Sequence, residues 1–283
     1  MNTNTETQKQ QKRRNVKTML KWTAIAAGAL IVLAVIVGVC NALFADGEWT
    51  FGWKNYRYDD SLYESGDATV PSDGITSIEI DWIDGIVQVI PCDDRYISLT
   101  EQTEVTLSDA ATVRWNVSAD GGKLSVKYRA SAWVLGDGSN KNLTLRVPRR
   151  LFAQLQSLTV TATSSDILLK ELEAKQLSVN TESGDLRAID CAFESVALTT
   201  KKGYFIYESA VCPSAAQIEF ESGKVELCLP TDVDLTLYWE HALTSDIPAV
   251  QGEGCYIFGK GSAQFRVTSK KPGELVIKVY SSK

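Results

Sequence analysis

The chain has 283 residues, 44% of them apolar, and a formal net charge of −6 at pH 7. Without the six bases and the single acid of its first 21 residues, the remainder carries about −11, so we expect no binding of nucleic acid or anionic lipid through its overall field. The six cysteines include no CxxC pair and are thinly spread, so the sequence indicates neither a disulfide scaffold nor a zinc site.

Two N-terminal segments predict a membrane anchor. Residues 1–21 are basic and otherwise mostly Asn, Thr and Gln, a composition that cannot build a core. Residues 22–45 carry no charge and supply roughly the 20 apolar residues that a helix needs to cross a lipid bilayer. The positive-inside rule then predicts a single-pass cell-membrane protein with a cytoplasmic N-terminal tail and an extracytoplasmic C-terminal domain. A cleaved signal peptide is the alternative, although its apolar core is usually only about 7 to 15 residues long.

The next segment, residues 46–74, holds six aromatic residues among Gly and Asp. Amphipathic aromatic rings favour the membrane interface, so a juxtamembrane segment is one interpretation. A strand or cap of the folded domain is the other, and the sequence does not separate the two.

From residue 75 to residue 283 the sequence predicts an all-β domain. Apolar residues alternate with polar ones, β-branched residues are frequent, and Gly, Ser and Asp interrupt the runs. Four consecutive segments also share one frame, with anchors at Ser165, Gly184, Gly203 and Gly223 that are 19, 19 and 20 residues apart. An isolated earlier copy places its turn at Gly85. A repeat of this length predicts a β-solenoid.

The two faces of the repeat follow from the same frame. Positions seven and five before each anchor, and two and four after it, are apolar or small, which predicts two strands with buried alternate side chains. Parallel stacking at about 4.8 Å would turn each apolar position into a ladder, and the crossover rule predicts a right-handed, β-helix-like winding. The positions are Leu158, Val160, Ile167, Leu169, Leu177, Val179, Leu186, Ala188, Val196, Leu198, Phe205, Tyr207, Ala216, Ile218, Val225 and Leu227.

The stretch from Gly85 to Ser165 spans 80 residues, about four repeat lengths, and two interpretations of it stay open. Its strand-like runs are compatible with degenerate rungs of the solenoid. The triplet 120–122, Asp-Gly-Gly, instead favours a hairpin turn and an antiparallel portion.

These residues resemble a known group. A single N-terminal helix, then IEIDWIDGIVQVIP and LTLRVPRRL, then serial units such as LSVNTESGDL and FESGKVEL, are similar to the bacterial putative-adhesin family of membrane-anchored β-strand-repeat domains. The resemblance covers about residues 75–280 and implies a β-solenoid or β-helix-like fold at the cell surface. It brings no catalytic residues, and the sequence departs from the family pattern at Ser165, at Lys202 and around His241.

Motifs for catalysis are weak. The single histidine, His241, has no nucleophile motif beside it, and the chain contains no GxxxxGK[ST], GxGxxG or HExxH pattern. We therefore predict a protein that is not an enzyme and needs no cofactor. Asp166 and Asp185 both follow an anchor directly, so stacking would place their carboxylates roughly 5 Å apart. Such a pair could ligate Ca²⁺ or match a retaining glycosidase, while the simpler interpretation is a preference of Asp for turns.

A second candidate site lies around the anchor Gly203. Tyr204 and Ile206 are predicted to face outward beside Lys201 and Lys202, a combination that could receive a glycan or an acidic polymer. An edge covered by a neighbouring loop explains the same residues. Lys201 also belongs to a column of alternating charge, and Cys92 and Cys191 are predicted to be small buried residues.

Together these features predict a cell-surface binding module, adhesin-like and non-catalytic, whose partner is a surface protein or a glycan. One alternative is an envelope-sensing or regulatory accessory that signals through the tail at residues 1–21. The other is a polysaccharide-acting enzyme on a β-helix.

Overall fold

The computed structural model describes residues 60–104, 107, 111–129, 140–271 and 273–281. The predicted basic tail, the predicted membrane helix at 22–45 and the first part of the aromatic segment, 46–59, lie outside the described residues. Within the described part of the chain, no helix is long and apolar enough to cross a membrane. The described helices are the short 3₁₀ segments η1 (Asp60–Leu62) and η3 (Arg149–Gln154).

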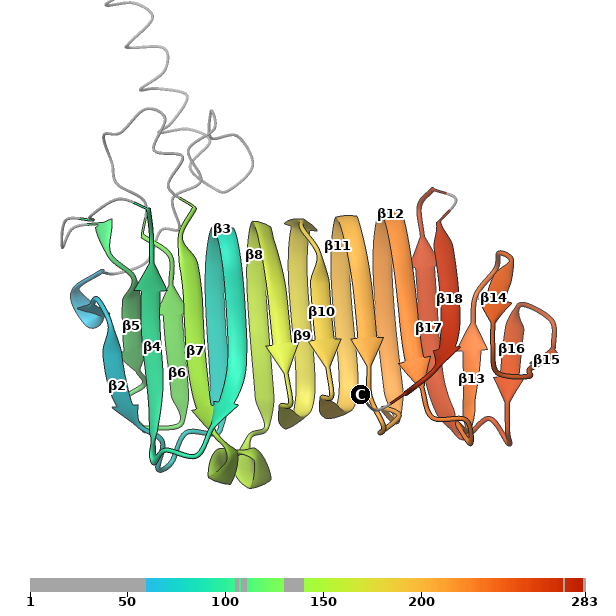
Figure 1. Ribbon diagram of the computed structural model, residues 1–283, viewed down its shortest axis with the longest axis horizontal. Coiled ribbons are helices and arrows are strands. Elements are labelled where there is room, and N and C mark those ends of the chain that lie inside the picture. The colour runs from blue at the N-terminus through green and yellow to red at the C-terminus, as the bar shows by residue number, and fades with distance from the viewer. Residues whose placement is uncertain (1–59, 105–106, 108–110, 130–139, 272, 282–283) are drawn as a thin grey trace, which may run out of the picture. The chain divides into compact units, whose positions relative to one another are not determined.

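The centre of the domain is a stack of parallel rungs, each rung being one copy of the repeat (Figure 1). The rungs are β8, β9 with β10, β11, and β12, and they pair in parallel in chain order. Gly203 lies opposite Gly223, as the frame predicts. The parallel solenoid is therefore confirmed, while its right-handed winding stays a prediction. The strand bounds are β8 (Ser157–Lys170), β9 (Glu173–Ser183), β10 (Leu186–Ile189), β11 (Ala192–Glu208) and β12 (Ala215–Leu229).

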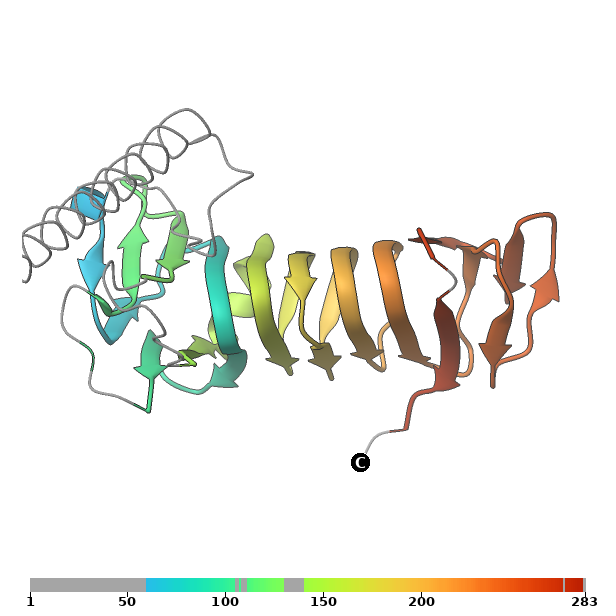
Figure 2. The same cartoon turned by 90° about the horizontal axis from the view of Figure 1, so that it is seen from above.

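The core lies between the two halves of each rung. All sixteen side chains predicted to point inward are buried, and the paired registers align them into ladders such as Leu158, Leu177, Val196 and Ala216. We call the outward surface of the half before each anchor the first face, and that of the half after it the second face. Figure 2 shows the rungs side by side from above.

The early copy of the repeat is not isolated in space. It forms β3 (Ser77–Cys92), which pairs in parallel with β8 and brings Gly85 opposite Ser165. On its other side β3 pairs in parallel with β6 (Lys123–Lys127) and β7 (Asn142–Pro148), which together make one more rung. The first repeat unit in the sequence, β3, is therefore the second rung of the stack, because the later strands β6 and β7 form the rung before it.

Antiparallel strands close this end of the solenoid. β4 (Tyr96–Gln102) pairs with β7, and β5 (Arg114–Val117) pairs with β6 through a hairpin turn at 118–122 that contains the predicted triplet 120–122. Each of the two interpretations of residues 85–165 thus holds for part of that stretch. β1 (Glu64–Ser65) and β2 (Ala68–Pro71) pair with β5 and β4, so the folded domain begins before residue 75.

The other end follows the same principle. The last strands, β17 (Ala263–Ser269) and β18 (Glu274–Val279), pair with β12 on one side and with β13 (Leu235–Tyr238) and β14 (Leu243–Ser245) on the other. The antiparallel strands β16 (Cys255–Phe258) and β15 (Val250–Gln251) then extend the sheet. The last strands in the sequence, β17 and β18, therefore form the rung between β12 and the strands β13 and β14 at the end of the stack.

Candidate functional site

The anchors form a ridge along the stack where successive backbones touch. A Cβ on Gly184, Gly203 or Gly223 would lie 2.0 to 2.2 Å from the carbonyl oxygen of the preceding anchor, and all three residues have positive φ. Glycine is therefore required at these positions by close approach as well as by conformation. Ser165 keeps the register without glycine; it is fully buried, and its hydroxyl makes no hydrogen bond within the described part of the chain.

The sequence-predicted aspartates lie directly beside this ridge on neighbouring rungs. Asp166 Oδ1 accepts a hydrogen bond from the backbone N–H of Asp185 at 2.8 Å, and Asp185 Oδ1 accepts one from the N–H of Tyr204 at 3.0 Å. In the same way, Asn142 Oδ1 accepts a hydrogen bond from the N–H of Ile86 at 2.9 Å. Sequence reasoning missed this role because Asn142 belongs to a rung without an anchor motif. These three side chains tie β7 to β3, β8 to the start of β10, and the start of β10 to β11.

Calcium binding at Asp166 and Asp185 stays a prediction. Among the described residues, no three Asp, Glu, His or Cys side chains come close enough to hold a metal ion. Asp166 also lines a hollow of about 540 Å³ beside β3, together with Glu104, Gln102, Asn140, Asn142 and Ser164. The hollow is polar, so it offers amide and carboxylate oxygens rather than an apolar pocket.

Tyr204 and Ile206 both lie on the second face, as predicted. The Tyr204 hydroxyl donates a hydrogen bond to Glu226, and the Lys224 ammonium lies 5.7 Å from the Tyr204 ring centre. Burial, followed by the Glu226 carboxylate, raises the pKa of Tyr204 to about 12. Burial also acts to raise the pKa of Glu226, but hydrogen bonds from Lys278 and Tyr204 hold it below its usual value.

The four residues predicted to form one ligand site do not form one cluster; they are Tyr204, Ile206, Lys201 and Lys202. Lys201 and Lys202 are exposed on the anchor ridge, where Lys201 pairs with Glu182 at 3.3 Å. The lysine that contacts Tyr204 comes from the next rung. The Lys201–Glu182 pair joins two neighbouring members of the predicted column of alternating charge.

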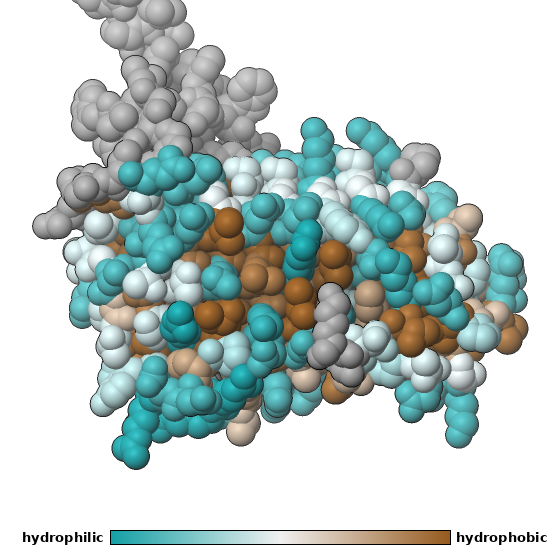
Figure 3. All heavy atoms as spheres, viewed as in Figure 1, coloured by the Kyte–Doolittle hydropathy of each residue, from teal (hydrophilic) through white to brown (hydrophobic). Residues whose placement is uncertain are grey.

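Partly exposed aliphatic side chains form an apolar band across the second face (Figure 3). They come from successive rungs, and charged side chains such as Arg187 and Glu208 lie between them. Along β8, β10 and β11 alternate side chains fill the core, so the side chains between them, including those of the band, must point outward. The band consists of Ile86, Leu168, Ile189 and Ile206.

The C-terminal segment crosses one end of the second face (Figure 1). The N–H of Tyr280 donates to the Leu229 carbonyl and its hydroxyl donates to Asp190 Oδ1, both at 2.7 Å. Beside this crossing, outward-facing Cys228 and Val276 are buried. The segment and the Tyr204–Glu226 contact therefore cover the second face toward β18, whereas Ile86 on β3 is 46% exposed and the other side chains of the band are partly exposed.

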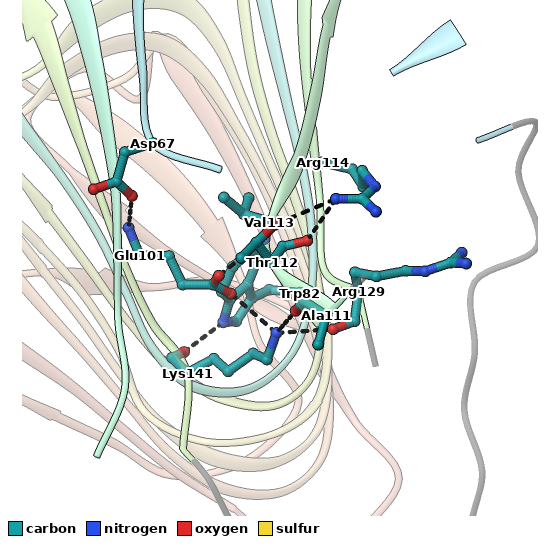
Figure 4. A network of polar contacts seen from close by, with 9 residues as sticks. All are labelled: Asp67, Trp82, Glu101, Ala111, Thr112, Val113, Arg114, Arg129 and Lys141. Carbon is teal, nitrogen blue, oxygen red and sulfur yellow. Dashed lines mark hydrogen bonds and ion pairs between the residues drawn. The ribbon is translucent and has the colours of Figure 1, made fainter. Parts of the chain in front are cut away.

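A buried ion pair connects the terminal strands near β3 (Figure 4). Lys141 Nζ lies 3.2 Å from Glu101 Oε1, and both side chains are almost fully buried. The ammonium also donates to the carbonyls of Ala111 and Arg129, while Glu101 Oε2 accepts the N–H of Val113. These bonds satisfy the charges, so we assign the network a structural role.

Three further residues that the sequence singled out differ in their surroundings. Cys191 is fully buried, which raises its pKa to about 12, as expected for a thiol that packs as a small apolar residue. Cys92 is only partly buried, so the prediction of burial was wrong there, because it ends β3 beside the turn to β4. His241 is exposed and packs edge-on against Trp239 at 4.9 Å between ring centres.

The fold and its surfaces define a β-solenoid with antiparallel end strands and regular outward columns. Residues 75–236 match the model of the Toastrack DUF4097 family, more than half of the chain, and the chain belongs to that family. The resemblance to bacterial β-strand-repeat proteins is thereby confirmed. No curated protein matches the chain.

Three solved structures show a more distant likeness. A putative cell adhesion protein from Clostridium sporogenes is 13% identical, with a TM-score of 0.47 over 76% of this chain and 99% of that one. A putative adhesin from Bacteroides fragilis is 10% identical, with a TM-score of 0.35 over 76% and 96%. A putative adhesin from Parabacteroides merdae is 8% identical, with a TM-score of 0.30 over 75% and 95%.

Proposed function

We propose that the chain is a membrane-anchored, adhesin-like binding module without catalytic activity, and that it binds a protein partner at the cell surface. The apolar band on the second face carries this proposal. Apolar side chains that converge on one exposed face are typical of a protein interaction surface. Here they lie on neighbouring parallel strands, so binding requires little reordering of the chain.

The charged residues within the band add selectivity. Arg187 lies between Leu168 and Ile206 in one column, and Asp166 and Glu208 flank the band. A partner that covers the aliphatic side chains must also supply groups that match these charges. Apolar contacts then give affinity, while the charges reject mismatched surfaces.

The anchor is the second part of the proposal. Residues 22–45 are expected to span the bilayer and residues 1–21 to remain in the cytoplasm. Protease added to intact cells should then remove the β-domain and leave a short membrane-bound fragment. Release of the full chain by alkaline carbonate would contradict a spanning anchor.

Site-specific photo-cross-linking in the producing cell tests the binding surface. We would place the photoreactive residue at Arg187 on the second face and, as a matched control, at Ser178 on the first face. A discrete protein adduct at Arg187, lost in Leu168→Asp and Ile206→Asp, is the expected result. Equal labelling at both positions, or no adduct at Arg187, would contradict the proposal.

A further inference from the structure

The first face differs in chemistry from the second. Three outward columns run across β8, β9, β11, β12 and β17, and all of their members are described. Glu219 and Arg266 are the two charged members; the others are hydroxyl, amide or alanine side chains. The columns read Ser157, Gln176, Ser195, Ala215, Gln264; Thr159, Ser178, Ala197, Gln217, Arg266; and Thr161, Asn180, Thr199, Glu219, Thr268.

A hollow of about 400 Å³ lies within these columns. It exists because Ala197 and Ala215 are small and lie on adjacent strands, while the longer side chains around them stand above the sheet. Its polar lining includes Gln176, Gln217 and Gln264, and its far end is Tyr238 of β13. The hollow is thus open and lined by both polar and apolar surface, and among the described residues that line it Arg266 alone is charged.

Several of these groups are held in place before any ligand binds. The Gln217 amide donates to Glu219 at 2.8 Å, and the Gln264 amide donates to the Gly261 carbonyl at 3.2 Å. The Arg266 guanidinium lies 5.3 Å from the Tyr238 ring centre, and Tyr238 remains 39% exposed. Fixed amides beside an accessible aromatic ring lower the entropy cost of binding.

The chemistry of the hollow selects its ligand. Amide and hydroxyl groups pair with a ligand whose groups both donate and accept hydrogen bonds, and Tyr238 offers an apolar surface with a polar tip. The three columns carry one cation, Arg266, and one anion, Glu219, so their net charge gives little attraction to a polyanion. None of the outward members of the three columns is a large aliphatic side chain, in contrast to the apolar band of the second face. Farther along the first face, the charges near β6 pair with one another, as in Lys123–Glu79 at 2.9 Å.

We propose that this first-face hollow binds a neutral polysaccharide, with a sugar ring against Tyr238 and its hydroxyls on the glutamine amides. Parallel strands repeat similar polar groups about every 4.8 Å, so a polymer can extend from the hollow along the columns. This function is independent of the protein partner proposed for the second face. It would give the protein a second class of ligand, a glycan, on a second surface.

Affinity electrophoresis of the detergent-solubilised full chain tests the proposal. The gels would contain hydroxyethylcellulose, galactomannan or dextran as neutral probes and polygalacturonate as the anionic probe. We expect retardation by at least one neutral probe and none by polygalacturonate. Tyr238→Ala and Ala197→Glu should weaken that binding about tenfold or more, the size of one central contact, whereas Tyr238→Phe should largely retain it.

The controls separate this site from the second face. Ile206→Asp should leave retardation unchanged, and Tyr238→Ala should leave the Arg187 cross-link unchanged. Because Tyr238 is exposed, its replacement should not unfold the chain, which an unchanged melting curve would verify. Retardation by none of the neutral probes, stronger binding to polygalacturonate, or equal binding by Tyr238→Ala would overturn the proposal.

Discussion

The close approach of the anchor glycines gives the sharpest test of the fold. In Gly203→Ala the new Cβ would lie 2.1 Å from the Gly184 carbonyl oxygen, whereas ordinary contacts begin at 3.4 Å. Two stacked backbones must therefore separate by more than 1 Å or distort. Positive φ costs roughly 1–3 kcal/mol, and overpacking of this kind adds roughly 1–3 kcal/mol. We expect a total loss of about 2–6 kcal/mol in the free energy of unfolding.

Gly121→Ala is the matched control. Gly121 also has positive φ, +74°, but within the described part of the chain nothing lies within 4 Å of its added Cβ. It should therefore lose only the conformational part, roughly 1–3 kcal/mol, without the cost of overpacking. For a domain of this size each kcal/mol shifts Tm by roughly 2–4 °C, so circular dichroism melts in detergent separate the variants. Equal Tm losses for Gly121→Ala and Gly203→Ala would refute the close-approach argument.

Three further predictions concern polar contacts. Asp185→Ala should lower the free energy of unfolding by about 1–2 kcal/mol in the same melts, because the Tyr204 N–H loses its acceptor, and Asp185→Asn should recover part of the loss. In ultraviolet titration Tyr204 should ionise near pH 12, and Glu226→Gln should move that ionisation downward; an unchanged titration would contradict the contact. Lys141→Met should cost roughly 3–5 kcal/mol because it leaves Glu101 buried and unpaired, and joint replacement with Glu101→Leu should restore much of the stability.

The acid dependence of stability follows from the same contacts. The folded-state pKa of Glu226 lies below its ordinary value of 4.5. Its stabilising contribution is therefore fully present above pH 4.5 and is lost as the pH falls through the folded-state pKa. Glu226→Gln should accordingly show a smaller loss of Tm on acidification than the unmodified chain.

Local sequence was sufficient to predict the central rungs. The spacing of Gly184, Gly203 and Gly223 and the inward alternation around them express short-range rules: glycine permits close backbone approach, and a strand alternates its faces. The same frame placed Asp166 and Asp185 on neighbouring rungs and turned Tyr204 and Ile206 outward. It did not reveal that the two aspartates accept backbone hydrogen bonds, since that depends on the neighbouring rung.

The sequence by itself thus determined the all-β class, the repeat length and the direction in which each central side chain points. The tertiary structure alone decided that β3 lies between β8 and the later β6 and β7, and that β17 and β18 lie between β12 and β13. Pairing between distant segments depends on which exposed sheet edge is left to cover, and no short-range pattern encodes that choice. The first-face hollow and the apolar band arise in the same way, because their residues become neighbours only when the rungs stack.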